Sequence, residues 1–451
     1  MLGTVMLAVM GFGSLMTIVT VSLTIIAEDL GTSRTTLGWI VTGLMLSMAV
    51  FTPLGGKLGD IRGHRRVFLV GLAGSIVTTV LCALAWNALS LIAFRVAFGM
   101  FGALVQPNGM ALMMAAYGRE RRATAMGWFQ FATTGAPTIG LVVGGPLISQ
   151  IGWRGIFWIF AGVSTVAFGL AYKVLRESPL GERIPLDVAG SLSLAATILF
   201  ALLAVSRAVR GGVTDPLAGA LLALAVGSLL TFIRVERRAA YPLLQLHYFR
   251  RPTFTAPMMA NSFNQFAYMG GFVVTPILLG DNAIYGYGLA GVAWLLAARP
   301  GAFAVSSPFG GMIATRLGEV KPMVAGSLMM VASMLSFTLG AQTEALVFVI
   351  AGLVLSGTSA GVGAPAFTTM VAGSVDQKDI GVATGMAQTM LFVGIVSGIQ
   401  VMLVVLGEQP DKGRYALTFL FGAGVAVVGL TCSLVAAWSA MRARALNPAV
   451  A

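Results

Sequence analysis

A polar, glycine-rich hinge between two long apolar runs occurs twice in this sequence. Residues 52–63 read TPLGGKLGDIRG, and residues 307–318 read SPFGGMIATRLG. Both copies keep the proline, the glycine pair and the final glycine at the same places. A hinge of this kind ends one apolar helix and starts the next. Its duplication therefore predicts a membrane protein built from two related halves.

The composition of the chain predicts a membrane protein that is surrounded by lipid. The sequence is 57% hydrophobic and only 10% charged, and its mean hydropathy is +0.90. Soluble domains carry about 25% charged residues, so a soluble protein of this composition would expose large apolar patches. The net charge of +12 does not indicate a nucleic-acid partner. The basic residues fall in short loops, where the positive-inside rule accounts for them.

Apolar runs of about 20 residues mark membrane-spanning helices, and the sequence predicts fourteen of them. They cover residues 3–27, 36–56, 66–86, 89–117, 123–149, 154–175, 187–206, 215–234, 253–279, 288–314, 321–341, 345–373, 379–406 and 415–440. An even number places both termini on one side of the membrane. Most of the 28 Lys and Arg residues lie in loops on that side. This bias predicts cytoplasmic termini in a multi-pass protein of the inner (cytoplasmic) membrane.

Four motifs, in this order, resemble those of the major facilitator superfamily. The segment Gly56–Arg66 resembles its cytoplasmic loop signature, and Arg95-x-x-x-Gly99 resembles its second motif, with Phe98 in place of the usual Gln. Residues 136–145 are similar to the antiporter motif of its export branches, and residues 153–157 (WRGIF) follow as in drug:proton antiporters. With fourteen predicted spans, the chain most resembles the fourteen-helix drug:proton antiporter branch.

The resemblance implies an all-α polytopic membrane fold with two six-helix bundles and an inserted helix pair. The implied domains are a first bundle at 1–175, the inserted pair at 187–234, a cytoplasmic linker at 235–252 and a second bundle at 253–440. The sequence shows no nucleotide-binding loop, no metal cluster and no nucleophile–base pair. We therefore expect no cofactor, no metal and no enzymatic activity.

The first hinge is a candidate gate. Asp60 can act as a latch in the outward-facing state by accepting hydrogen bonds from a neighbouring helix end or Arg. The alternative is a basic loop that only sets the orientation of the chain, and we favour this alternative for Arg65 and Arg66. Gly56 and Gly63 belong to the gate because the second hinge keeps both glycines.

Two further motifs are candidates for coupling or for structure. The resemblance ties Arg95 to proton coupling, whereas an Arg inside hydrocarbon can equally bond backbone carbonyls. Gly99 lies on the same helical face. The antiporter-like motif contributes Pro137, Gly140, Gly144 and Gly145. The resemblance places this motif at the contact between bundles, and plain helix packing is the alternative.

A polar stripe marks the run 253–279 as a candidate wall of the substrate cavity. Asn261, Asn264, Gln265 and Tyr268 follow the spacing i, i+3, i+4, i+7 of one helical face. Such side chains would be unsatisfied in lipid, so they must face a cavity or make interhelical hydrogen bonds. Gln130 and Gln388 are further candidates on two other runs. The motif Gly357-x-x-x-Gly361, in contrast, predicts helix packing only.

The positions of the acidic residues give little support to proton coupling. All 16 of them fall at span ends or in loops, and both histidines lie in loops. Proton relays usually use intramembrane Asp, Glu or His, so proton coupling is implied by the resemblance and not by the residues. Asp60, Asp187 and the ends of the first and ninth predicted spans (3–27 and 253–279) are the remaining candidates for holding a proton.

The span interior holds two cations instead, Arg95 and Arg299. Arg299 precedes Pro300 near mid-depth and has no acidic partner at helical spacing. It either attracts an anionic or amphipathic substrate, together with Arg95, or bonds backbone carbonyls beside the proline.

We predict a secondary active transporter that exports amphipathic small molecules or drugs across a lipid bilayer by alternating access. Protons are the coupling ion that the resemblance implies. Two alternatives stay open. One is an uncoupled, anion-selective or lipid-selective carrier, and the other is a transporter-like sensor without flux, because the second hinge carries Thr315 where the first carries Asp60.

Overall fold

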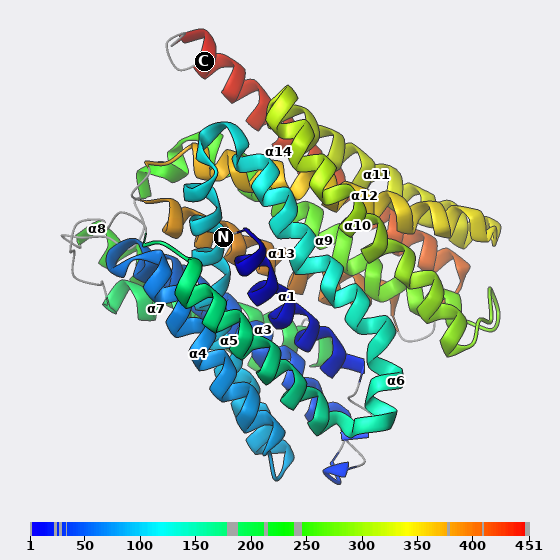
Figure 1. Ribbon diagram of the computed structural model, residues 1–451. Helices are drawn as coiled ribbons and strands as arrows, with labels where there is room; N and C mark the ends of the chain where they lie inside the picture. Colours follow the sequence, from blue (N-terminus) through cyan, green and yellow to red (C-terminus); the bar gives the residue numbers. More distant parts are fainter. Residues whose placement is uncertain are drawn as a thin grey trace.

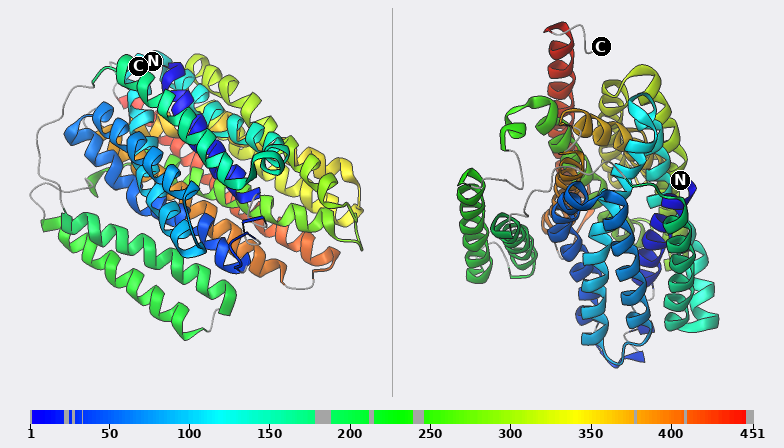
Figure 2. Two further views of the ribbon diagram at one scale, coloured as in Figure 1. Left: turned by 60° about the horizontal axis from the view of Figure 1, so that its bottom comes forward. Right: turned by 60° about the vertical axis from the view of Figure 1, so that its left-hand side comes forward.

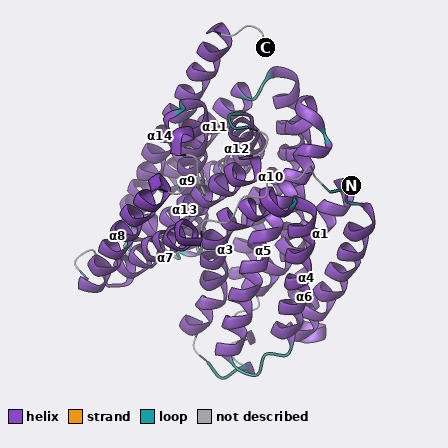
Figure 3. Cartoon of the chain, turned by 90° about the vertical axis from the view of Figure 1, so that its left-hand side faces the viewer, coloured by secondary structure: helices purple, strands orange, loops and turns teal. Residues whose placement is uncertain are grey.

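The computed structural model describes residues 2–21, 25–26, 29–32, 34–177, 188–211, 215–238, 246–376, 379–407 and 410–446. Every regular element in this part of the chain is a helix (Figure 3). A helix satisfies its own backbone hydrogen bonds, which a chain surrounded by lipid requires.

The helices fall into three groups along the chain (Figure 1). The first group is α1 (Leu2–Val21), α3 (Arg34–Arg62), α4 (His64–Ala83), α5 (Ala88–Ala116) and α6 (Gly118–Val174). The second is α7 (Val188–Gly211), α8 (Pro216–Arg238) and the short 3₁₀ helix η1 (Leu246–Arg250). The third is α9 (Pro252–Gly280), α10 (Leu289–Leu317), α11 (Val320–Thr343), α12 (Leu346–Gly373), α13 (Ile380–Leu406) and α14 (Lys412–Leu446).

Glycine places the sharpest breaks in the chain. α6 consists of two helical rods joined at Gly152, where φ is 68°. The two hinges end alike: Gly63 precedes α4 with φ 93°, and Gly318 follows α10 with φ 82°. These left-handed values favour glycine because it has no Cβ. The final glycine of each hinge therefore allows the same left-handed turn of the backbone in both halves.

The paired glycines of the two hinges also pack alike. A Cβ on Gly55 would collide with the backbone of Ala103 in α5, and one on Gly310 would lie 2.6 Å from Cα of Val362 in α12. The contacts of α3 with α5 and α13 are matched by those of α10 with α12 and α6. The repeat in the sequence thus corresponds to a repeat in the packing, with α3 and α10 in equivalent roles.

Length and composition suit a membrane. Within the described residues, eight helices are long and apolar enough to cross one: α4, α5, the second rod of α6, α8, α11, α12, α13 and α14. α9 is not among them, because Asn264 and Gln265 lower its hydropathy. Large apolar side chains such as Trp86, Leu89 and Trp158 are exposed on the outer surface, as is expected of side chains that face lipid.

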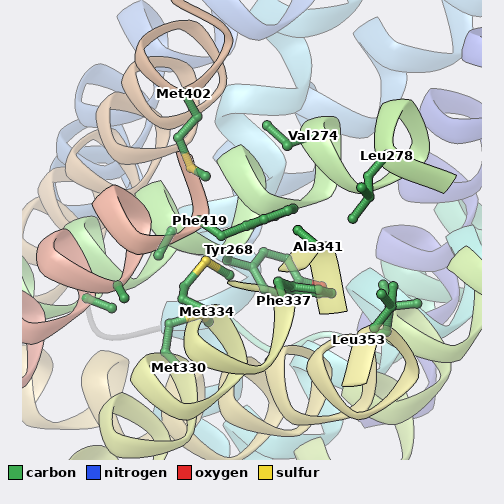
Figure 4. Packing of buried hydrophobic residues seen from close by; sticks show 14 of the residues in the cluster. Tyr268, Val274, Leu278, Met330, Met334, Phe337, Ala341, Leu353, Met402 and Phe419 are labelled. Atoms are coloured by element: carbon green, nitrogen blue, oxygen red, sulfur yellow. The ribbon is translucent and has the colours of Figure 1, made fainter. Parts of the chain in front are cut away.

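The core of the third group of helices is dense and rich in methionine (Figure 4). Met334 and Phe337 of α11 pack with Tyr268 of α9 and Phe419 of α14. The rings of Phe337 and Phe419 stack with centroids 5.1 Å apart. Because lipid is as apolar as these side chains, close van der Waals packing holds such helices together.

α7 and α8 pack on each other and stand beside the main body (Figure 2). α7 contacts both α3 and α13, so it touches helices of both hinge-related groups. Phe232 of α8 packs with Tyr248 and Phe254, next to the start of α9.

Candidate transport site and gate

The two halves meet closely where α6 and α10 cross, at the end of the molecule where α3 turns into α4. We call this the hinge end. The Ser307 hydroxyl donates to the Gly127 carbonyl oxygen at 2.7 Å, and the hydroxyls of Thr124 and Thr315 are 2.8 Å apart. A Cβ on Gly311 would collide with the Ala123 carbonyl oxygen. Only small residues permit this approach, so the hinge end is tightly closed here.

Apolar side chains close the hinge end on the opposite flank of the contact. Met110, Met113 and Met114 of α5 form one buried cluster with Ala372 of α12 and Ile380 of α13. Gln388 of α13, predicted to line the substrate cavity, lies against this cluster, with Nε2 3.3 Å from Sδ of Met110. Gln388 therefore sits at a contact between the halves in this closed form.

Asp60, which the sequence predicts to be a gate residue, is part of a cluster that joins three helices. Its carboxylate lies 3.4 Å from Nε2 of His64, at the start of α4. Nδ1 of His64 lies 2.8 Å from Oδ1 of Asn108 on α5. The sequence-based prediction did not include Asn108. Asn108 could have been found in the sequence as a polar amide within an otherwise apolar run, which is the pattern that marked the candidate residues of α9.

Arg65 and Arg66, which the sequence predicts to set only the orientation of the chain, contact the last turn of α6 and the residues just after it. The Arg65 amide donates to Oε1 of Glu177 at 3.0 Å, and its guanidinium donates to the Tyr172 carbonyl oxygen at 2.7 Å. Arg66 pairs with the same carboxylate at 3.5 Å. A Cβ on Gly63 would lie 2.5 Å from Oε1 of Glu177. These contacts tie α4 to α6, whereas a gating role stays a prediction.

Arg95 is fully buried, and none of its three guanidinium nitrogens has a hydrogen-bond partner in the described part of the chain. Its guanidinium lies 5.3 Å from the centroid of the Phe98 ring. Gly99 faces α3, where a Cβ would lie 2.6 Å from the Leu44 carbonyl oxygen. The predicted carbonyl contacts of Arg95 are therefore not seen among the described residues. Four further predicted residues lie in α6 with side-chain positions outside the description: Pro137, Gly140, Gly144 and Gly145.

The polar stripe of α9 lines one small cavity. Asn261, Asn264, Gln265 and Tyr268 face it together with residues of α11 and α12. The space inside the cavity can hold about one water molecule. An ordinary small-molecule site has a volume of roughly 300–1,000 Å³, so this cavity is far smaller. Asn264 donates to Ser327 at 2.8 Å, while its buried Oδ1 has no hydrogen-bond partner among the described residues. Both predicted environments, cavity and interhelical bond, thus occur on one stripe.

Arg299 lies beside this stripe and is 1% exposed. Its guanidinium donates to the Tyr268 carbonyl oxygen and stacks on the Tyr268 ring at 3.5 Å. Nε and Nη1 have no partner among the residues described. The predicted hydrogen bond from Arg299 to a backbone carbonyl is therefore present. Two of its guanidinium nitrogens remain available as donors to a ligand or to residues outside the described ranges. Gln130, the remaining cavity candidate, accepts a hydrogen bond from Thr133 at 3.1 Å within α6.

At the end of the molecule opposite the hinges, hydrogen bonds link α6 to the α1–α3 and α4–α5 connections. Asp29 accepts hydrogen bonds from Trp153 Nε1 at 3.0 Å and from Arg154 at 2.5 Å. Arg154 also donates to the Ala85 carbonyl oxygen at 3.1 Å. The hydrogen bond from Arg154, with that from Trp153, lowers the pKa of the Asp29 carboxyl. The WRGIF segment therefore anchors the corner of α6 to two other connections.

Replacing Asp29 by Asn is expected to lower thermal stability slightly, by about 1 kcal/mol or less, because exposed ion pairs contribute little. Since the pKa is lowered, the contribution is present above about pH 4 and disappears as the pH falls through the lowered pKa. Melting of the purified protein near neutral and acid pH checks this. A difference between parent and variant that persists at the lowest pH would contradict it.

The linker before α9 is fastened to the α12–α13 connection. The Tyr248 hydroxyl donates to Asp379 at 3.0 Å and accepts from the Asp376 amide at 3.2 Å. Burial, reinforced by these carboxylates, raises the pKa of Tyr248 to about 12. Tyr248 therefore stays a neutral donor at physiological pH.

The profile of the Major Facilitator Superfamily matches residues 3–399 and 258–449. This chain belongs to the major facilitator superfamily. The second match falls on the half that begins with α9, in agreement with the repeat seen in the hinges. The predicted family and its all-helical fold are thereby confirmed.

Relatives within the superfamily include resistance proteins. The chain is 29% identical over 408 residues to the tetracenomycin C resistance and export protein of Streptomyces glaucescens, covering 88% of this chain and 74% of that protein. It is 26% identical to the multidrug transporter protein MdtP of Bacillus subtilis (strain 168), over 88% of this chain and 73% of that one. The crystal structure of the human organic anion transporter MFSD10 (TETRAN) aligns with a TM-score of 0.68 at 17% identity, over 96% of this chain and 98% of that chain. This last likeness shows the shared fold.

Proposed function

We propose that this major facilitator protein is a secondary active transporter that exports amphipathic small molecules by alternating access. The observation that carries the proposal is the contact between α6 and α10, where Gly127 and Gly311 let two repeat-related halves close tightly at one end. A closure made by small residues and a few hydroxyls can separate at modest cost. The export direction is supported by the name of the Streptomyces glaucescens relative, a resistance and export protein. The drug-like substrate is supported by that name and by the name of the multidrug transporter protein MdtP.

The proposed topology has fourteen spans, with α6 contributing two and α7–α8 forming the inserted pair. The first bundle covers 1–175, the second 253–440, and the linker 235–252 lies between them. The hinge end faces the cytoplasm, because Lys and Arg concentrate in its loops. Both termini then lie in the cytoplasm, and the closed form has its passage shut on that side.

The proposed substrate subsite is the α9 stripe with Arg299. The cavity is too small for a drug in the closed form, so binding needs a wider form of the same wall. Amide groups at Asn261, Asn264 and Gln265 can donate and accept, which suits polar groups on an otherwise apolar molecule. Proton coupling is proposed from the superfamily resemblance.

A second candidate function is an uncoupled carrier selective for anions or anionic lipids. The observation that favours it is the pair of buried arginines, Arg95 and Arg299, five of whose nitrogens have no hydrogen-bond partner within the described ranges. A buried cation attracts anions and repels cations strongly where little water screens it.

Transport by the purified protein in sealed proteoliposomes with an imposed pH step tests both candidates. The panel should hold cationic, neutral and anionic amphipathic dyes. We expect dye accumulation that depends on the pH step for the coupled exporter, and anion flux without that dependence for the uncoupled carrier. Absence of flux for every dye would contradict both, and would favour a sensor without transport.

A further inference from the structure

The end of α8 and the segment just before α9 carry five exposed arginines. We call them the α8–η1 arginines: Arg234, Arg237, Arg238, Arg250 and Arg251. None of the five forms an ion pair with another residue in the described part of the chain. A guanidinium is always charged and offers five N–H donors. These side chains therefore form a positive surface that can accept an anionic partner.

A buried aromatic cluster holds the two arginine-bearing segments together. Phe232 of α8 belongs to one cluster with Tyr248 of η1 and Phe254 of α9. The rings of Tyr248 and Phe254 have centroids 5.9 Å apart. The arginines follow these anchors within two helical turns on α8 and within three residues on η1, so both sets lie at the same end of the molecule. The guanidinium of Arg251 lies 5.1 Å from the centroid of the Tyr248 ring, which orients it.

α8 sets the level of these charges relative to a bilayer. It stands at the edge of the molecule (Figure 2) and is one of the helices that are long and apolar enough to cross a membrane. Leu222 and Leu230 are exposed on its sides, whereas Arg237 and Arg238 occupy its last turn. When the apolar part of α8 lies in hydrocarbon, these charges reach the headgroup layer. Phe249 beside them is 39% exposed, so an apolar ring lies next to the charges.

The start of α9 adds to the positive potential. α9 begins at Pro252, directly after Arg251, and its first turn holds no acidic residue and no capping side chain. A helix N-terminus carries a partial positive charge that favours phosphate groups. Three acidic residues lie near this segment, Glu236 of α8 and Asp376 and Asp379 before α13. The five arginines exceed them in charge, so the surface is positive overall.

We propose that the α8–η1 arginines bind the phosphate headgroup of an anionic phospholipid. The planar guanidinium matches the geometry of phosphate oxygens, and basic side chains at headgroup level attract anionic lipids. Arginines that only set the orientation of the chain would not need to select among lipids. The bound lipid joins the inserted helix pair to the start of α9. The site lies outside the proposed passage, and lipid binding is measured without transport.

Native mass spectrometry of the full chain, with lipids titrated into detergent, measures the affinity for single lipid molecules. The probes are dioleoyl phosphatidylglycerol and dioleoyl phosphatidylcholine, which share their acyl chains and differ in headgroup charge. We expect phosphatidylglycerol to bind the parent about tenfold more tightly, because each arginine near the headgroup adds a several-fold preference. Inorganic phosphate should displace no more lipid than chloride does at equal ionic strength, since acyl chains also hold the lipid.

The test variant replaces all five α8–η1 arginines by Gln. The matched control removes five exposed positive charges elsewhere: Arg62→Gln, Arg121→Gln, Arg316→Gln, Lys321→Gln and Arg442→Gln. We expect the preference to fall to about twofold in the test variant and to persist in the control. Lys at all five positions should retain part of it, because the charge stays and the planar fork is lost. If the test variant does not fold, Arg250→Gln with Arg251→Gln is compared with Arg121→Gln and Arg316→Gln instead.

A parent that binds both lipids equally would overturn the lipid site. An equal loss of preference in the control variant would do so as well, because the attraction would then belong to the overall charge of the protein. Specific displacement by inorganic phosphate would identify a site for the free ion and not for a lipid. Dye flux is measured separately in proteoliposomes. Lipid selectivity without flux would reject the transport function and leave the lipid site standing, and flux without lipid selectivity would do the reverse.

Discussion

Gly311→Val is expected to prevent closure of the hinge end and to stop transport. A Cβ at this position would collide with the Ala123 carbonyl oxygen and lie 3.0 Å from the Cα atoms of Gly127 and Thr124. Overpacking of this kind costs about 1–3 kcal/mol. Because only the closed form suffers, its population should fall roughly tenfold to hundredfold relative to the open form.

Gly301→Val is the matched control on the same helix, since a Cβ there meets no atom within 4 Å. Pulsed electron paramagnetic resonance between spin labels at Arg121→Cys on α6 and Arg316→Cys on α10, with Cys82→Ala and Cys432→Ala, measures the closed and open populations of both variants. Dye flux in proteoliposomes measures their transport. The prediction fails if Gly311→Val closes and transports like the parent. It also fails if Gly301→Val is equally impaired, because the effect would then belong to valine in α10 and not to the contact with α6.

Arg299→Gln is expected to reduce transport of anionic dyes about tenfold and to spare neutral dyes. The variant keeps a side chain that can donate to the Tyr268 carbonyl oxygen but removes the buried charge. Hydrogen bonds to charged groups contribute about 1.5–3 kcal/mol, which corresponds to a factor of roughly ten or more in affinity. Initial rates for a matched pair of anionic and neutral dyes measure the difference.

Arg316→Gln serves as the control, because it removes a positive charge from the exposed end of the same helix. Arg299→Lys should retain part of the preference for anions, since it keeps the charge but loses the planar donor fork. If Arg299→Gln changes both dye classes to the same extent, the anion hypothesis is wrong. The residue would then be a structural link between α9 and α10.

The periodic features of the sequence predicted the all-helical fold correctly, and several local features that they indicate recur in the structure. The hinge copies ended at glycines with left-handed φ, and Gly357-x-x-x-Gly361 packs against α10, where a Cβ on Gly361 would lie 2.6 Å from the Phe303 carbonyl oxygen. The polar stripe of α9 does gather at one cavity. These features depend on local geometry, since helical spacing alone decides which side chains share a face.

Partners distant in the sequence escaped prediction. Asn108 meets His64 across 44 positions, and Glu177 meets the Arg65 amide across 112. In the sequence, Asp29 is only one of the 16 acidic residues at span ends or in loops, yet in the structure it accepts hydrogen bonds from Trp153 and Arg154. No spacing rule links such residues, because their contact depends on which helices pack together and at what height.

The sequence by itself determined that this chain is helical, belongs in a membrane and consists of two related halves. Apolar run length and a duplicated glycine hinge are enough for that, because both act on neighbouring residues. Only the tertiary structure decided that Gly311 closes on α6, that Arg299 stacks on Tyr268 and that His64 stands between Asp60 and Asn108. Those contacts join separate helices, and their geometry is set by the packing of the whole bundle.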